Sequence, residues 1–190
     1  MATTDNAVQY DILFLDELAK NVSDFDKTEI QTLGKAAELG WIQRDRVAET
    51  VVAKLAKLDV VSIEGMDFSD GSDMKTVVSS YRNNDKKRGG WSNSFEIRNI
   101  GTKTGALRIM AYNKLLKKFH YFFIPRYAYA HLNSVLTITI ETGTCHIGEP
   151  NFTGIPRGNK FWEFECASLQ EMCDMREESL DQWDLKFNKI

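Results

Sequence analysis

Six residues between positions 49 and 75 are of the types that metal-assisted hydrolysis requires. Five are carboxylates and one is a lysine: Glu49, Glu64, Asp67, Asp70, Asp73 and Lys75. Mg²⁺ takes one or two carboxylates and keeps several waters. The bound ion lowers the pKa of a water and neutralises the charge that grows on a reacting phosphate, and a nearby ammonium stabilises the same charge. This segment therefore favours hydrolysis of a phosphodiester.

Three predicted elements must position these groups. The apolar spacing of RDRVAETVVAKLAKLD predicts a helix over residues 44–59 that carries Glu49. The β-branched run DVVSI predicts a strand over 59–63, and DMKTVVSSY predicts a returning strand from Asp73. Asp70 and Gly71 signal the turn between the two extended segments. Asp73 and Lys75, two positions apart on one strand, are expected to face the same side.

The length of that turn decides which acid faces Asp73. A two-residue turn at Asp70 and Gly71 puts Asp73 on the side of Glu64 and leaves Asp67 on the other. A three-residue turn with Gly71 in the left-handed conformation puts Asp67 directly opposite Asp73. We prefer Asp67 as the partner, with Glu64 as its replacement, and assign Asp70 to the turn itself.

Asp73-Met74-Lys75 resembles the DxK half of the PD-(D/E)xK nucleases, which include most type II restriction endonucleases. The likeness covers residues 45–80, where a helix, a strand, a turn and the DxK strand follow in the same order. It departs from the family in having no proline before the first acid and a short spacing from Asp67 to Asp73. The resemblance implies that Asp67 and Asp73 hold Mg²⁺, that Lys75 lies beside the attacking water, and that Glu49 assists.

The rest of the chain predicts an α+β fold in one nuclease domain over residues 1–190. Residues 1–45 are expected to be helical, and 46–190 to form the catalytic core. Further strands are predicted from SFEIRNI, ALRIMAYN, KKFHYFFIPRYAYAHL, SVLTITIETGT and KFWEFECA, with GTKTG as a turn between the first two. Pro125 marks the third of these as an interrupted strand or an edge strand. A C-terminal helix over 168–187 is predicted from a capping box at Ser168 and Glu171. We expect a central mixed or antiparallel sheet of five to six strands, with a catalytic hairpin.

The basic residues are concentrated in one stretch of an otherwise acidic chain. The net charge is −3, yet residues 82–126 hold eleven basic and two acidic residues (+9), against 13 and 25 elsewhere (−12). Such asymmetry indicates a polyanion partner. The candidate DNA contacts, to phosphates or base edges, are Lys86, Lys87, Arg88, Arg98, Asn99, Lys103, Arg108, Lys114, Lys117 and Lys118.

Together these features predict a cytoplasmic, Mg²⁺-dependent, site-specific endonuclease of double-stranded DNA that acts as a homodimer. The alternative is a non-catalytic nucleic-acid-binding module that uses residues 82–126, and an interaction protein with an acidic partner is a third class. Three histidines fit a His-metal nuclease poorly, because no His-rich hairpin is followed by a helix. Three cysteines without CxxC spacing do not make a zinc motif. No apolar run is long enough for a membrane span.

Overall fold

The fold is α+β, with two helices and ten strands in the part of the chain that the computed structural model describes. The described residues are 32, 35, 44–79, 92–113, 118–141, 144–149, 159–178 and 187–189. The helices are α3 (Arg44–Ala56) and α5 (Leu169–Asp174). The strands are β1 (Val60–Ile63), β2 (Met66–Phe68), β3 (Asp73–Ser79), β4 (Ser92–Arg98), β5 (Leu107–Asn113), β6 (Lys118–Ile124), β7 (Val135–Glu141), β8 (Thr144–Glu149), β9 (Asn159–Glu165) and β10 (Phe187–Lys189).

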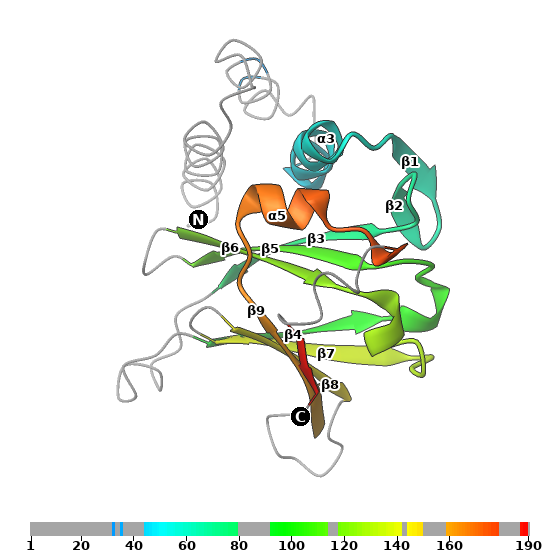
Figure 1. Cartoon of the computed structure of the whole chain (residues 1–190), viewed down its shortest axis with the longest axis vertical. Coiled ribbons are helices and arrows are strands. Elements are labelled where there is room, and N and C mark those ends of the chain that lie inside the picture. The colour runs from blue at the N-terminus through cyan, green and yellow to red at the C-terminus, as the bar shows by residue number, and fades with distance from the viewer. Residues whose placement is uncertain are drawn as a thin grey trace, which may run out of the picture.

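The elements are stacked in three layers (Figure 1). Helices α3 and α5 cover one face of a three-stranded sheet, ordered β3-β5-β6. A five-stranded sheet, ordered β10-β9-β8-β7-β4, covers the other face. Strands β1 and β2 form a separate two-stranded sheet beside α3. The middle sheet therefore has apolar cores on both sides.

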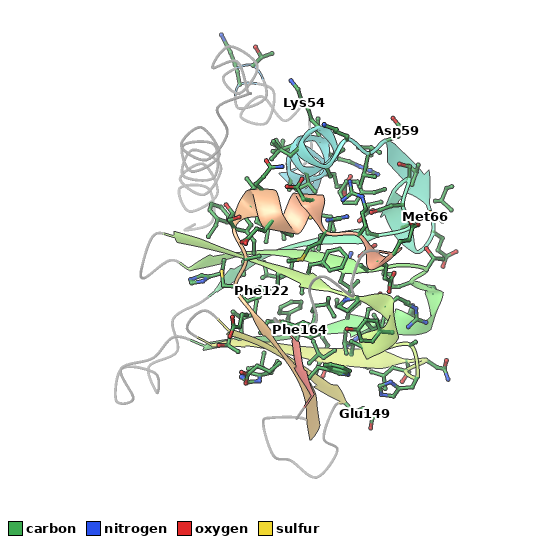
Figure 2. The ribbon with its side chains drawn as sticks, in the orientation of Figure 1. Lys54, Asp59, Met66, Phe122, Glu149 and Phe164 are labelled. Atoms are coloured by element: carbon green, nitrogen blue, oxygen red, sulfur yellow. The ribbon has the colours of Figure 1, made fainter. Side chains whose placement is uncertain are left out.

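Side-chain alternation along the middle sheet builds these two cores. In β6, Phe119 and Phe123 face the helices, whereas Phe122 and Ile124 face the five-stranded sheet. Figure 2 shows Phe122 between the sheets, on the same side as Phe164 of β9. A strand buried on both faces is expected to be almost wholly apolar, as the sequence KFHYFFI is.

Helix α3 forms as its apolar periodicity predicts. Val47, Val51 and Val52 lie on one stripe and are buried against the middle sheet. The helix ends at Lys57, whose φ of 56° is left-handed, and the Leu58 amide donates to the Ala53 carbonyl. This is a Schellman ending, in which glycine is the usual residue.

The C-terminal helix is shorter than its sequence predicts. The capping box is confirmed, since the Ser168 hydroxyl accepts from the Glu171 amide and the Glu171 carboxylate accepts from the Ser168 amide. Helix α5 nevertheless ends at Asp174, and Met175 is extended, with ψ of 135°. The predicted helix over 168–187 is therefore wrong over residues 175–178, because the carbonyls of Met172 and Met175 bind Arg108 instead, and at Phe187, which begins β10. Residues 179–186 lie outside the described part of the chain.

Each predicted strand segment contains a strand, but the set of strands and their pairing differ from the prediction. Strands β2, β8 and β10 were not predicted, and the segment after Ile124 forms a 3-10 turn over Arg126–Ala128 in place of an extended strand. Strand β3 does not return along β1 and β2; it pairs with β5, in parallel. Strands β4 and β5, which flank GTKTG, lie in different sheets, since β4 pairs with β7. Three sheets of two, five and three strands replace the expected single sheet.

Several predicted segments lie outside the described residues. They include the expected helices before residue 44, apart from helical Thr32 and Lys35, and the basic loop over 82–91. Among the residues that are described, no helix is long and apolar enough to cross a membrane.

Candidate active site

The turn over residues 68–72 places the acidic residues of the site. The Gly71 amide donates to the Phe68 carbonyl at 2.9 Å, and the Phe68 amide donates to the Ser72 carbonyl at 3.1 Å. Gly71 has a φ of 83°, which glycine adopts without strain. This is the predicted three-residue turn with a glycine bulge, and it brings Asp67 opposite Asp73.

Beyond the turn, strands β2 and β3 separate. The Asp73 amide donates to the Ala106 carbonyl at 2.9 Å, which starts the parallel pairing of β3 with β5. The Met74 amide points the other way, toward the free edge of β3 in the described sheet, and donates to Asp67 Oδ2 at 2.8 Å. The side chain of Asp67 thus replaces a backbone partner at this edge.

Asp73 is buried and is held by two ammonium groups. It is 2% exposed. Lys103 Nζ donates to its Oδ1 at 2.5 Å, and Lys75 Nζ lies 2.5 Å from its Oδ2. The contact with Lys75 is an ion pair without hydrogen-bond alignment, because Lys75 Nζ donates to the Met74 carbonyl at 3.0 Å. Asp73 and Lys75 therefore share one face of β3, as predicted.

Asp67 carries an unfavourable charge in this environment. Burial raises the pKa of its carboxyl, the hydrogen bond from the Met74 amide lowers it, and the negative charge of Asp73 raises it. The ammonium groups of Lys75 and Lys103 offset part of this, and the pKa stays above its ordinary value. The two carboxylates are thus close enough to repel each other.

A cavity of about 180 Å³ opens beside these groups at the edge of β3. Its lining consists of Glu49, Asp67, Met74, Lys75 and Thr76. Glu49 enters from helix α3 and is 7% exposed, and its Oε2 lies 2.7 Å from Arg46 Nη1. The sequence-predicted residues Glu49, Asp67 and Lys75 therefore meet around one space.

A tightly packed loop carries Lys103 to the site. It follows a 3-10 turn over Ile100–Thr102. A Cβ on Gly65 would lie 2.1 Å from the Thr102 carbonyl oxygen, and one on Gly105 would lie 2.6 Å from the Gly71 carbonyl oxygen. The loop backbone therefore touches both turns that flank β2. Gly105, two residues after Lys103, is the sequence signal that could have indicated this contact, whereas the sequence predicted a DNA contact for Lys103.

Arg108 is a structural residue, so its predicted DNA contact is wrong. Its side chain is fully buried. The guanidinium donates to Ser72 Oγ, Asp70 Oδ2 and the carbonyls of Met172 and Met175, and it lies over the ring of Phe123. It shares the helix-facing side of β5 with Met110, and that periodicity could have indicated its burial.

The other predicted residues lie away from the carboxylates or are not described. Glu64 is exposed in the turn between β1 and β2, so the structure favours Asp67 over it as the partner of Asp73. Arg98 and Asn99 are exposed at the end of β4, where Asn99 has a φ of 54°. Lys118 begins β6, but its side chain is not described. The remaining predicted contacts lie outside the described residues: Lys86, Lys87, Arg88, Lys114 and Lys117.

The carboxylates suit a hard cation, but they do not form a closed metal cage. In the described part of the chain, no group of three or more His, Cys, Asp or Glu side chains converges as metal ligands. Two repelling carboxylates beside a cavity match Mg²⁺, which keeps several waters. Both oxygens of Asp73 meet an ammonium, so a cation at Asp73 would compete with the two lysines.

No protein-family model matches the chain, and no curated protein or solved structure shows significant similarity to it. The function therefore has to be argued from the site itself.

Proposed function

We propose that this protein is a Mg²⁺-dependent endonuclease that hydrolyses phosphodiester bonds of double-stranded DNA. The observation that carries the proposal is that Asp67 and Asp73 lie close together across one turn, with Lys75 on Asp73. Glu49 lines the same cavity as Asp67 and Lys75. Two carboxylates and a lysine in this arrangement are the groups that metal-assisted phosphodiester hydrolysis uses.

Asp67 and Asp73 are the residues that would hold the ion. Burial, and to a lesser degree the charge of Asp73, raise the pKa of Asp67, and a divalent cation would offset both effects. When bound, Mg²⁺ lowers the pKa of a water and neutralises charge on the reacting phosphate. Lys75, whose side chain is 32% exposed, orients the nucleophilic water or stabilises the phosphate. Glu49 holds a water or accepts its proton across the cavity.

We further propose that the enzyme is site-specific and homodimeric, as type II restriction endonucleases are. Two-fold symmetric subunits that each cut one strand match a short palindromic target. Phosphate contacts from the basic stretch over 82–126 would make the affinity for DNA fall steeply with salt. Sedimentation with and without duplex DNA measures the oligomeric state directly.

Incubation with a mixed-sequence plasmid and Mg²⁺ tests the proposal. Discrete fragments support a site-specific enzyme, and a smear supports a nonspecific nuclease. Intact DNA with both Mg²⁺ and Mn²⁺, over a range of salt concentrations, contradicts catalysis. EDTA should abolish cleavage in the same preparation.

A non-catalytic DNA-binding module is the second candidate, and one observation favours it. The charges of Lys75 and Lys103 already balance those of Asp67 and Asp73, so the cluster needs no ion to be neutral. Binding without cleavage by the wild-type protein, and equal binding by Asp73→Asn, would support this module. Failure to retard duplex DNA even at low salt would point instead to an interaction protein.

A further inference from the structure

Asp73 contacts two ammonium groups, those of Lys75 and Lys103. Lys75 already lies at its Oδ2, yet Lys103 also donates to Oδ1 at 2.5 Å. The side chain of Lys103 is 15% exposed, half the exposure of Lys75. Taking an ammonium out of water costs free energy that a carboxylate already paired with another lysine returns only in part. Lys103 is also the ammonium that hydrogen-bonds Asp73, since Lys75 meets Oδ2 without hydrogen-bond alignment. Lys103 is therefore the cation most closely held on this carboxylate.

Hydrogen bonds and a close backbone contact fix the position of the backbone around Lys103. The Lys103 amide donates to the Ile100 carbonyl, and Thr104 Oγ1 donates to the Gly71 carbonyl. Gly105 packs on Gly71 so closely that a Cβ would lie 2.6 Å from its carbonyl oxygen. The turn that presents Asp73 and the loop that presents Lys103 are thus joined directly.

We propose that Lys103 is a positioning residue that occupies the place of the divalent cation on Asp73 and sets the affinity of the site for that ion. The inference rests on the proposed function. Without the ion, the ammonium of Lys103 keeps the buried carboxylate of Asp73 neutralised and oriented. Binding of the ion requires Lys103 to give up Oδ1, which leaves its charge beside the site and available to a DNA phosphate.

Two substitutions at this position should change metal affinity in opposite directions. Lys103→Met removes the competing charge and keeps most of the side-chain volume. A charge in contact with a carboxyl changes its proton affinity by about 1–3 pKa units, so we expect Mn²⁺ to bind roughly tenfold more tightly or better. Lys103→Arg keeps the charge and offers a fork that binds carboxylate through two N–H groups, so we expect weaker Mn²⁺ binding.

Calorimetric titration of the full chain with Mn²⁺, without DNA, tests the inference. The panel is wild type, Lys103→Met, Lys103→Arg, Asp73→Asn and Lys57→Met. Lys57 is exposed at the end of α3, and its loss should leave the affinity unchanged. The rise in melting temperature on adding Mn²⁺ is a second readout, because a ligand that binds the folded state stabilises it. If Lys103→Met does not fold, the expected loss of affinity in Lys103→Arg still decides the question.

The outcomes separate this inference from the proposed function. Tighter binding by Lys103→Met and weaker binding by Lys103→Arg support the role of Lys103. Mn²⁺ affinities within about twofold of wild type in both variants overturn it, while wild-type binding that Asp73→Asn abolishes still supports the metal site. No binding of Mn²⁺ by wild type or by Lys103→Met overturns the metal site and the inference together.

Discussion

Asp70 and Asp73 lie on the two sides of Gly71, and each pairs with basic side chains, but the partners differ in kind. Asp70 pairs with the fully buried Arg108 at 2.8 Å, and Asp73 pairs with two partly exposed lysines. Arg108 also donates to Ser72 and to two carbonyls, that of Met172 in the last turn of helix α5 and that of Met175 just after the helix. The fork of an arginine suits a fixed network, whereas a lysine is a flexible point charge that can be exchanged. The comparison indicates a structural pair at Asp70 and a functional cluster at Asp73.

The carboxyl pKa values support the same division. Burial would raise the pKa of Asp70, but hydrogen bonds from Ser72 and the charge of Arg108 outweigh it, and the pKa is lowered. The pKa of Asp67, across the turn from Asp73, is raised. A charge that the fold stabilises is typical of a structural role. A charge that the fold opposes is typical of a site that sacrifices stability for function.

The largest expected effect is on catalysis at Asp73. Asp73→Ala should lower the DNA cleavage rate at least about 10³-fold, because it removes a proposed metal ligand and the partner of Lys75; this corresponds to about 4 kcal/mol of transition-state stabilisation. Single-turnover cleavage of plasmid DNA measures the loss.

Asp59→Ala is the matched control for Asp73→Ala. Asp59 is exposed in the same segment, just before β1, and lies at the periphery in Figure 2. The cleavage rate of this variant should stay within about twofold of wild type, since surface substitutions have small effects. A comparable loss in both variants would contradict the special role of Asp73.

The second-largest effect is expected on the free energy of unfolding when Asp70 loses its partner Arg108. Arg108→Met should lower the free energy of unfolding by about 3–5 kcal/mol, because it leaves Asp70 and two carbonyls without their buried donor. Urea denaturation followed by circular dichroism measures this change. Lys75→Met, which removes a partly exposed partner of Asp73, should cost less than half as much. A cost below about 1 kcal/mol for Arg108→Met would show that the Arg108 network is not structural.

A smaller effect is expected at the turn that separates the two aspartates. Gly71→Ala should destabilise the protein by about 1 kcal/mol, because alanine is strained at a φ of 83°. The new Cβ would lie 3.5 Å from Thr104 Oγ1, an ordinary contact, so no clash adds to this cost.

Lys57→Gly is the matched reverse of Gly71→Ala. Lys57 has a φ of 56° at the end of α3, so glycine there should stabilise the protein by up to about 1 kcal/mol. Thermal unfolding of both variants should therefore show shifts of opposite sign. Shifts of the same sign would mean that backbone strain does not control these positions.

The smallest expected effect is a pH dependence that distinguishes Asp67 from Asp70. Where the pKa of a carboxyl is higher in the folded than in the unfolded state, protonation of that carboxyl stabilises the folded protein. Asp67→Asn should therefore stabilise the protein at pH 7 by up to about 1 kcal/mol, and this gain should vanish as the pH falls to the ordinary value of 3.8.

A lowered folded pKa acts in the opposite direction. The contribution of Asp70 is fully present above pH 3.8 and is lost as the pH falls through its folded pKa. Asp70→Asn should thus destabilise at pH 7, and the loss should shrink in acid. Unfolding curves between pH 7 and pH 3 measure both variants, and parallel pH profiles for them would contradict the division.

The sequence predicted the local parts of the site. The left-handed glycine of the turn and the alternation of strand residues determine where Asp67, Asp73 and Lys75 lie. These contacts join residues that are at most about eight positions apart in the sequence. The helix carrying Glu49 was equally predictable, because its apolar stripe is continuous over Arg44–Ala56.

The contacts between distant parts of the chain could not be predicted from local patterns. The strands next to β3 in the sequence, β2 and β4, were its expected partners. Strand β3 pairs in parallel with β5 instead, and the chain passes through β4 of the other sheet between them. Arg108 and Lys103 both lie in the basic stretch, so charge alone predicted DNA contacts for both. Their partners Asp70 and Asp73 are 38 and 30 positions away, and only the tertiary structure brings them together.

Cleavage of duplex DNA by Asp70→Asn and Asp73→Asn, compared with wild type in Mg²⁺ at a temperature where all three are folded, tests the central claim most directly. We expect Asp70→Asn still to cut at a rate within about tenfold of wild type, and Asp73→Asn to bind DNA without cutting it. Cleavage by Asp73→Asn, or equal loss in both variants, would contradict it.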